Sequence, residues 1–235
     1  MRTAIAIFCK TPGRSPVKTR LAAGIGKNDA EELYRLSISA VNEVVLRAVK
    51  EYRHQIGAFW AVAEEDALMD PVWNTLPCIW TGEGELGERI HHVFEELFAS
   101  YEQVVIIGSD SPQMTTEYII EALDTLTQKN VDGVIGPCRD GGFVLFGSKI
   151  PLAKSIWTDV QYSRVNTLGH LMFLLHEKHY RYRKFSALGD VDTYDDLIML
   201  YDDFIQMGSK MQQQQKKLFV WLSDYLMKRN LWRKA

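Results

Sequence analysis

The 235-residue sequence lacks the features that mark several common protein classes. Its three cysteines, Cys9, Cys78 and Cys138, are odd in number and widely spaced, which argues against a disulfide framework or a zinc site. The net charge is -3, so nothing attracts the chain globally to nucleic acid or to a membrane surface. No apolar run approaches the roughly 18 residues that cross a bilayer, and the N-terminal run is too short for a signal peptide. We therefore expect a cytoplasmic protein without a nucleic-acid or membrane partner.

Familiar catalytic motifs are missing as well. The chain contains neither the Walker A pattern GxxxxGK[ST] nor the GxGxxG dinucleotide fingerprint. No nucleophile, base and orienting group for acyl transfer can be assembled. The six histidines fall mostly on predicted helix surfaces, which disfavours a histidine metal site. Any cofactor or anion must therefore be held by local groups of carboxylates or basic residues.

Strand-like and helix-like segments alternate along the chain, as in an α/β protein with a mostly parallel sheet. The loop at residues 10–26 shows no helical pattern, and Asn28 or Asp29 is expected to cap the long helix that follows it. Residues 182–185 are expected to form an edge strand. Predicted strands cover residues 3–9, 55–63, 77–80, 104–107, 131–136, 143–146 and 182–185, and predicted helices cover 28–52, 86–101, 115–129, 166–178, 194–207 and about 210–235.

Residues 1–207 are expected to form one domain. Residues 208–235 open with a glutamine-rich stretch and continue with a broad aromatic and aliphatic helical face. Such a face must be buried. The segment is therefore expected to pack back on its own domain or, alternatively, on the partner in a homodimer.

The segment VVIIGSDSP places Asp110 directly after a run of β-branched residues, followed by proline. Such a run is typical of a central parallel strand, and ligands of α/β sheets bind beyond the carboxyl ends of the strands. Asp110 is therefore a candidate metal ligand. The alternative is that Asp110 caps the helix starting near Thr115 or closes a turn.

The first loop, KTPGRSPVKTRLAAGIG, gathers basic side chains just after the first predicted strand. Lysine supplies a point charge and arginine a two-pronged donor, while glycine and proline fix a backbone whose amides can face an anion. The loop is therefore a candidate phosphate site through Lys10, Arg14, Lys18 and Arg20. A solvated basic loop is the alternative.

Two further acidic segments follow predicted strands. In GPCRDGGF, Asp140 precedes Gly141 and Gly142, which permit close approach of the backbone to a ligand, although a plain hairpin turn explains these residues equally well. In LGDVDTYDDL, helix capping explains Thr193 and Asp196, but it does not explain the presence of both Asp190 and Asp192. A fourth segment, GEGELGERI, is a glycine-rich helix entry with Arg89 one turn inside the helix. Three acidic loops and one basic loop suggest a divalent metal that bridges a polyphosphate.

These segments together resemble the GT-A-fold family of nucleotide-diphospho-sugar-transferase-like proteins described as DUF2064 or arsenosugar-biosynthesis-type glycosyltransferases. The resemblance spans about residues 1–200 and rests on five motifs in order: the KTRL loop, GELGER, GSDSP, GPCRDGGF and DVDTYDDL. The chain departs from the family pattern at Ser15, where glycine is usual, at Glu85 in place of aspartate, and at Phe143 in place of tyrosine.

The resemblance implies a Rossmann-like, three-layer αβα sandwich with a mostly parallel central sheet and a C-terminal helical extension. It implies a metal-dependent transferase that uses a nucleotide-diphosphate sugar and a small-molecule acceptor, with Mg or Mn as cofactor. The implied catalytic residues are Asp110, Asp192 and Lys18, with Asp110 and Asp192 as metal ligands. The implied phosphate-binding residues are Lys10, Lys18, Thr19, Arg20 and Arg89, and the implied substrate-binding residues are Asp140, Gly141 and Gly142.

Two other functions remain open from the sequence. The same site could join an NTP to a phosphorylated or carboxylated acceptor with release of pyrophosphate, because the basic loop suits a triphosphate. A third reading is a non-catalytic nucleotide-binding protein on the same fold.

Overall fold

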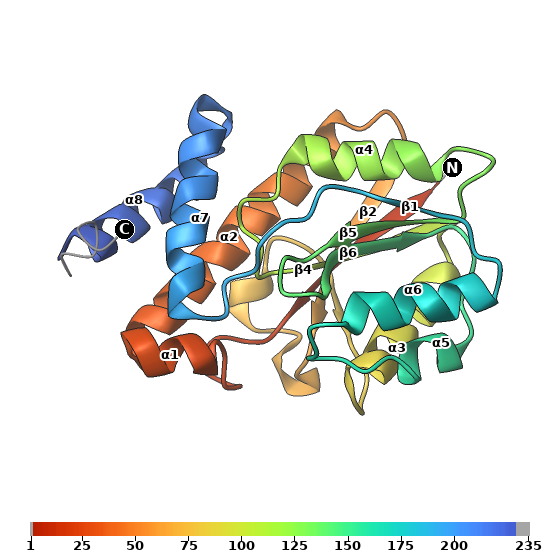
Figure 1. Cartoon of the computed structure of the whole chain (residues 1–235), viewed down its shortest axis with the longest axis horizontal. Helices are drawn as coiled ribbons and strands as arrows, with labels where there is room; N and C mark the ends of the chain where they lie inside the picture. Colours follow the sequence, from red (N-terminus) through yellow and green to blue (C-terminus); the bar gives the residue numbers. More distant parts are fainter. Residues whose placement is uncertain (1, 229–235) are drawn as a thin grey trace.

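A central sheet of seven strands, in the order β3-β2-β1-β4-β6-β5-β7, organises the chain. The computed structural model in Figure 1 describes residues 2–228. The strands are β1 (Thr3–Cys9), β2 (Ile56–Val62), β3 (Cys78–Trp80), β4 (Gln103–Gly108), β5 (Gly133–Pro137), β6 (Phe143–Ser148) and β7 (Tyr182–Lys184). The α-helices are α1 (Thr19–Ile25), α2 (Lys27–Glu51), α3 (Leu86–Phe98), α4 (Thr116–Leu126), α5 (Lys154–Thr158), α6 (Thr167–Glu177), α7 (Tyr194–Met207) and α8 (Gln213–Lys228).

The sheet is mostly parallel, as predicted. β1 pairs in parallel with β2 and β4, β2 with β3, and β5 with β7, whereas β6 is antiparallel to both β4 and β5. The ends of β1, β2 and β4 and the start of β6 therefore meet at one edge of the sheet. The sequence places its acidic and basic loops at this edge.

Helices cover both faces of the sheet and complete the predicted three-layer sandwich (Figure 1). Alternate residues of β1 pack in opposite directions: Ile5 and Ile7 face α2 and α4, whereas Ala4 and Ala6 face α3, α5 and α6. A third apolar cluster joins α1, the start of α2, α7 and α8.

Two predictions for the first loop and the helix after it were wrong. Thr19–Ile25 forms helix α1 inside the segment predicted to be irregular, and its Leu21 and Ile25 are buried against α7 and α8. A segment of seven residues is too short for the spacing of its apolar residues to indicate a helix, and so short a helix is stabilised mainly by tertiary packing. The helix α2 starts at Lys27 after Gly26, with no side-chain cap, so neither Asn28 nor Asp29 caps it.

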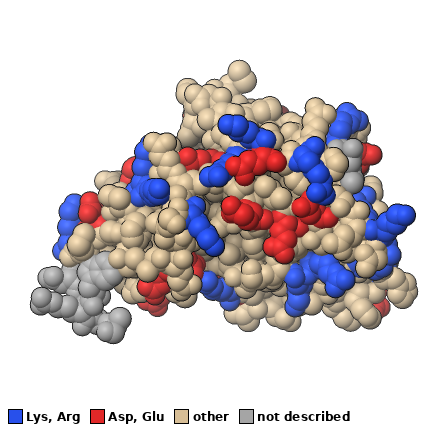
Figure 2. Space-filling view, turned by 90° about the horizontal axis from the view of Figure 1, so that it is seen from above, with Lys and Arg blue, Asp and Glu red and all other residues tan. Residues whose placement is uncertain are grey.

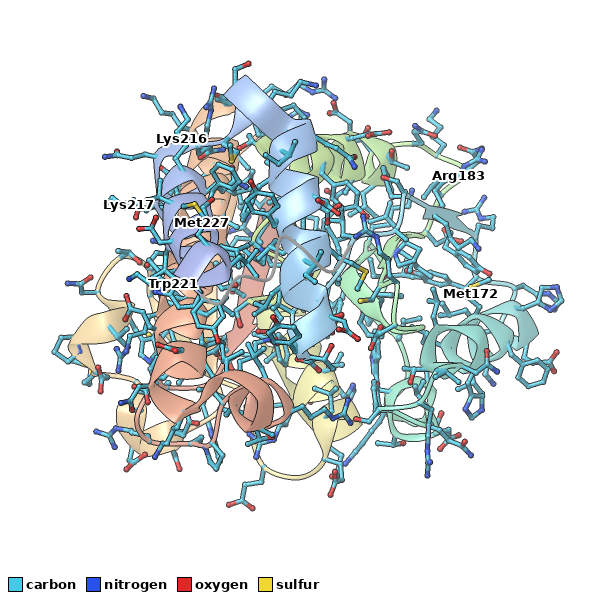
Figure 3. The ribbon with its side chains drawn as sticks, turned by 60° about the vertical axis from the view of Figure 1, so that its left-hand side comes forward. Met172, Arg183, Lys216, Lys217, Trp221 and Met227 are labelled. Carbon is cyan, nitrogen blue, oxygen red and sulfur yellow. The ribbon has the colours of Figure 1, made fainter. Side chains whose placement is uncertain are left out.

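The C-terminal helix α8 packs against α2 and α7 of its own chain. It lies beside α7, on the opposite side of the molecule from Met172 of α6 (Figure 3). The glutamines at its start bind the rest of the domain: buried Gln215 donates from Nε2 to the carbonyl oxygens of Pro112 and Met114, at 2.8 and 2.9 Å. The last residues of the predicted helix, 229–235, lie outside the described residues.

The remaining predicted elements differ from the structure mainly at their ends. The edge strand predicted at residues 182–185 is β7, which ends the sheet. Helix α5 was not predicted from the sequence. Within the described residues, no helix is long and apolar enough to cross a membrane.

Candidate functional site

A polar cleft of about 940 Å³ opens at the edge where β1, β2 and β4 end. Its walls come from the loop after β1, the ends of β2 and β3, the start of α3, and the segments after β4 and before α7. Figure 2 shows a different face of the molecule, seen from above, on which acidic and basic side chains are interspersed. The lining includes Lys10, Lys18, Thr19, Arg20, Tyr34, Glu64, Arg89, Asp110 and Asp192. Apart from Arg14, the predicted phosphate and metal residues thus line one cavity.

Lys18 joins the two predicted metal ligands. Its Nζ lies 2.8 Å from Oδ1 of Asp110 and 3.2 Å from Oδ1 of Asp192. The Lys18 side chain is 3% exposed, whereas the two aspartates are 42% and 43% exposed. Burial alone lowers the pKa of Lys18, but the charges and hydrogen bonds of Asp110 and Asp192 outweigh it, so that the pKa is raised. Lys18 is therefore a charged ammonium that bridges two carboxylates.

Backbone contacts bring the two aspartates together although 82 positions of sequence separate them. The N–H of Val191 donates to the carbonyl oxygen of Asp110 at 3.2 Å, so the segment before α7 runs beside the turn after β4. The left-handed backbone of Lys18, with φ of 49°, then turns its side chain toward both carboxylates at the start of α1. Such a conformation is uncommon for a residue with a Cβ atom.

Neither aspartate is used as a helix cap. Thr115 caps α4 by accepting the N–H of Tyr118, and Thr193 with Asp196 caps α7. The alternative that Asp110 caps the helix near Thr115 is therefore wrong. The carboxylates of Asp110 and Asp192 face Lys18 in the cleft instead.

The other predicted phosphate-binding residues differ in how they are held. Lys10, Thr19 and Arg20 are exposed on the cleft wall. Arg89 is engaged with the protein: it donates to the carbonyl oxygens of Gly84 and Ala63 and to Oγ1 of Thr81, at 2.9 to 3.1 Å. It thereby ties α3 to the ends of β2 and β3. Arg14 pairs with Asp66 and Asp70 and does not line the cleft.

Asp140, Gly141 and Gly142 form the turn between β5 and β6, as a hairpin reading predicts. Oδ1 of Asp140 accepts the N–H of Gly142 at 2.8 Å, and Gly141 has φ of +96°. A Cβ atom at Gly141 would overlap the carbonyl group of Val165. Asp140 and Gly142 line a second cavity that adjoins the cleft, whereas Gly141 fixes the turn against the loop before α6.

Asp190 lies close to this turn. Ligand-type atoms of Cys138, Asp140 and Asp190 lie within 4.8 Å of one another. Burial, and next the charge of Asp140, raise the pKa of Asp190 to about 6. Burial likewise raises the pKa of Cys138, which is an unpaired thiol. From the sequence, Asp190 had no assigned role, and Cys138 was predicted to belong to neither a disulfide framework nor a zinc site.

The pair Asp110 and Asp192 fits a hard divalent cation. Both offer carboxylate oxygens, which Mg²⁺ and Mn²⁺ prefer, and one positively charged group already lies within about 3 Å of both oxygens. Magnesium is commonly held by one or two carboxylates and completed by substrate phosphates. The open cleft beside the pair leaves space for such phosphates.

Two residues of the cleft were missed by sequence reasoning. The hydroxyl of buried Tyr34 accepts the N–H of Lys10 at 2.8 Å and the hydroxyl of Ser109 at 3.4 Å, so it joins the ends of β1 and β4. Glu64 follows β2 and accepts two hydrogen bonds from Thr11. Glu64 could have been predicted as a cleft residue from its position just after a strand. Tyr34 could not, because it lies within a long amphipathic helix and no local sequence pattern distinguishes it.

Solved structures share the fold. A protein from Desulfovibrio desulfuricans, assigned provisionally as a nucleotide-diphospho-sugar transferase, has a TM-score of 0.78 at 22% identity, covering 95% of this chain and 97% of that one. A nucleotidyl transferase from Methanothermobacter thermautotroptrophicus has 0.57 at 13%, covering 88% and 99%. A CMP:2-keto-3-deoxy-manno-octonic acid synthetase complexed with CTP has 0.53 at 12%, covering 88% and 100%. The predicted fold is confirmed.

Comparison with curated proteins finds no match. The sequence profile of DUF2064, described as uncharacterized proteins conserved in bacteria, matches residues 45–164, which is half of the chain and includes three of the five motifs of the resemblance. The protein belongs to the DUF2064 family.

Proposed function

We propose that this protein is a metal-dependent, nucleotide-using transferase that moves a sugar from a nucleotide-diphosphate sugar to a small-molecule acceptor. The observation that carries the proposal is the bridge from Asp110 through Lys18 to Asp192 on the wall of the polar cleft. Two carboxylates and a buried ammonium at the end of a parallel sheet suit a metal and a diphosphate.

In this proposal, Asp110 and Asp192 hold a divalent cation, Mg or Mn. When bound, the cation would offset the negative charge of the diphosphate leaving group. Lys10, Thr19 and Arg20 bind phosphate oxygens from the exposed wall of the cleft. Lys18, whose Nζ contacts both carboxylates, would add a positive charge beside the phosphates.

The transfer step links the acceptor to the donor sugar. A hydroxyl oxygen of the acceptor bonds to the anomeric carbon, the bond from that carbon to the β-phosphate oxygen breaks, and the nucleoside diphosphate leaves with the electron pair. The hydroxyl proton passes to the exposed carboxylate of Asp140 and from there to water.

Nucleotidyl transfer is the second candidate, because two observations favour it. Basic side chains of Lys10, Lys18 and Arg20 line the cleft, which suits a triphosphate, and a structural neighbour is complexed with CTP. In that reaction the acceptor attacks the α-phosphorus of an NTP and pyrophosphate leaves. A non-catalytic nucleotide-binding role would use the same cleft without turnover.

The test compares products and matched variants. The protein with Mg or Mn is incubated with nucleotide sugars to detect free nucleoside diphosphate, and with each NTP plus candidate phosphates to detect pyrophosphate. Asp110→Asn and Asp192→Asn are expected to lower turnover by about 100-fold or more. Asp66→Asn, an exposed carboxylate outside the cleft lining, serves as control. Pyrophosphate without free diphosphate would replace the first candidate by the second, and unchanged turnover in both cleft variants would refute the proposed site.

A further inference from the structure

A second cavity of about 250 Å³ adjoins the polar cleft and differs from it in chemistry. The two share Phe8, Leu86, Gly108 and Ser163 as common walls, so a molecule can extend from one into the other. The second cavity lies over the end of β4 and the start of β6, between α3 and the loop before α6. A transferase needs one place for its donor and another for its acceptor.

The walls of this cavity are mainly apolar. Ile90, Ile106 and Val144 form buried walls, and Phe143 and Tyr162 add aromatic rings. Two of its hydroxyl-bearing residues contribute little polarity, because Thr167 is engaged with the loop before α6 and the hydroxyl of Tyr162 is buried. An apolar wall of this kind favours an apolar group, since burial removes its surface from water.

The only charged side chain in the lining, among the residues that the structure describes, is Asp140. The polar cleft, by contrast, has Lys10, Lys18, Arg20 and Arg89 in its walls. A phosphate or carboxylate in the second cavity would therefore meet a carboxylate without a compensating cation. The cavity disfavours anionic acceptors and accepts a group that donates a hydrogen bond to Asp140.

The cavity volume limits the size of the occupant. A cavity of about 150 Å³ lined by aliphatic and aromatic side chains holds a benzene ring. At about 250 Å³ this one has room for a single ring and a short substituent. A disaccharide or a second nucleotide is too large to fit inside it.

We infer that the second cavity binds the acceptor, and that the acceptor is an uncharged alcohol with a small apolar body, such as an aryl or cycloalkyl group. This inference rests on the proposed transferase function and defines its acceptor. The apolar body lies against Leu86, which also lines the cleft, and against Phe143, and the hydroxyl points to Asp140. The phosphorylated or carboxylated acceptors of nucleotidyl transfer do not suit these walls.

Benzyl alcohol, glycerol and benzyl phosphate test this inference by ligand-observed NMR titration of the full chain. Benzyl alcohol is apolar and neutral, glycerol is polar and neutral, and benzyl phosphate is apolar and anionic. We expect benzyl alcohol to bind at least tenfold more tightly than glycerol and fivefold more tightly than benzyl phosphate. Equal affinity for benzyl alcohol and glycerol, or tighter binding of benzyl phosphate, would overturn the inference.

Variants locate the binding site. Leu86→Ser is expected to weaken benzyl alcohol binding at least threefold, because Leu86 is 44% exposed at the shared wall. Leu46→Ser is the matched control, a helical leucine 40% exposed on α2 outside both cavities. Asp140→Asn keeps an oxygen that can accept the N–H of Gly142 and removes the negative charge. It should therefore reduce the difference in affinity between benzyl alcohol and benzyl phosphate. The proposed site would be contradicted if both leucine variants weakened benzyl alcohol binding equally. It would also be contradicted if Asp140→Asn left the affinity difference between benzyl alcohol and benzyl phosphate unchanged.

A parallel titration with ADP, CDP, GDP and UDP in the presence of Mg separates this inference from the function on which it rests. Failure of all four nucleotides to bind overturns the proposed function and the acceptor role with it. Binding of a nucleotide, combined with no preference for benzyl alcohol, overturns the acceptor class alone.

Discussion

Replacing Lys18 by methionine should destabilise the protein and, at the same time, make it respond more strongly to divalent cations. The substitution keeps the length of the buried side chain but removes the ammonium that bridges Asp110 and Asp192. The two carboxylates then face each other without a cation. Because both are about 40% exposed, water offsets part of the loss.

The expected loss follows from the charges involved. Breaking a buried ion pair by removing one partner costs about 3–5 kcal/mol, and the exposure of both aspartates reduces this to about 2–3 kcal/mol. At roughly 2–4 °C per kcal/mol for a chain of this length, the melting temperature should fall by roughly 4–12 °C. Lys10→Met, at an exposed position of the same cleft, should change it little.

A divalent cation should restore the stability that Lys18→Met loses. A ligand at a concentration 100 times its Kd stabilises the native state by about 2.7 kcal/mol, which matches the expected loss. In the unchanged protein the cation must first displace the Lys18 ammonium, so Mg or Mn without nucleotide should stabilise it less. Thermal unfolding followed by circular dichroism, over a magnesium titration, measures both effects. Equal stabilisation of the two proteins by the metal would refute the interpretation that Lys18 occupies the cation position.

Three further substitutions test the supporting structure. Gly141→Ala should lower the free energy of unfolding by at least about 2 kcal/mol, because it combines positive φ with overlap against a facing carbonyl group. Asp132→Asn should cost about 1–2 kcal/mol at pH 7. Hydrogen bonds from Arg181 lower the pKa of Asp132, so the destabilisation caused by Asp132→Asn should vanish as the pH falls below that lowered pKa. Urea unfolding at several pH values measures this destabilisation, and a value that does not change with pH would contradict the prediction. Arg89→Met should cost about 2 kcal/mol by loss of its hydrogen bonds, and an unchanged urea midpoint would show that the bonds are dispensable.

The order of the elements and the edge that carries the site could be predicted from the sequence. β-branched runs and helical periodicity marked most strands and helices, and the alternation of the two placed Asp110 beyond a strand end. Helix α1 was not predicted because its apolar residues are buried only by packing against α7 and α8, which lie far away in the sequence. The antiparallel direction of β6 follows from the tight turn at Asp140, which was recognised only as one of two alternatives.

The assembled site was less predictable than its members. Sequence motifs gathered Lys18, Asp110 and Asp192 in one region, but they could not show that the lysine lies buried between the two acids. That arrangement depends on the left-handed conformation of Lys18 and on the backbone contact between Val191 and Asp110. The apolar cavity depends on side chains from separate helices, strands and a loop, which no local pattern brings together.

The hydrogen bonds from Gln215 set an order of events during synthesis. The turn that follows Asp110 is held by a side chain that lies 103 positions later than Pro112. A nascent chain can therefore complete all seven strands of the sheet before this turn acquires its final support. A product that ends ahead of Gln215 would contain every proposed cleft residue and still lack the hydrogen bonds that hold the turn after Asp110, so we expect the cleft to reach its final shape only after Gln215 has been made.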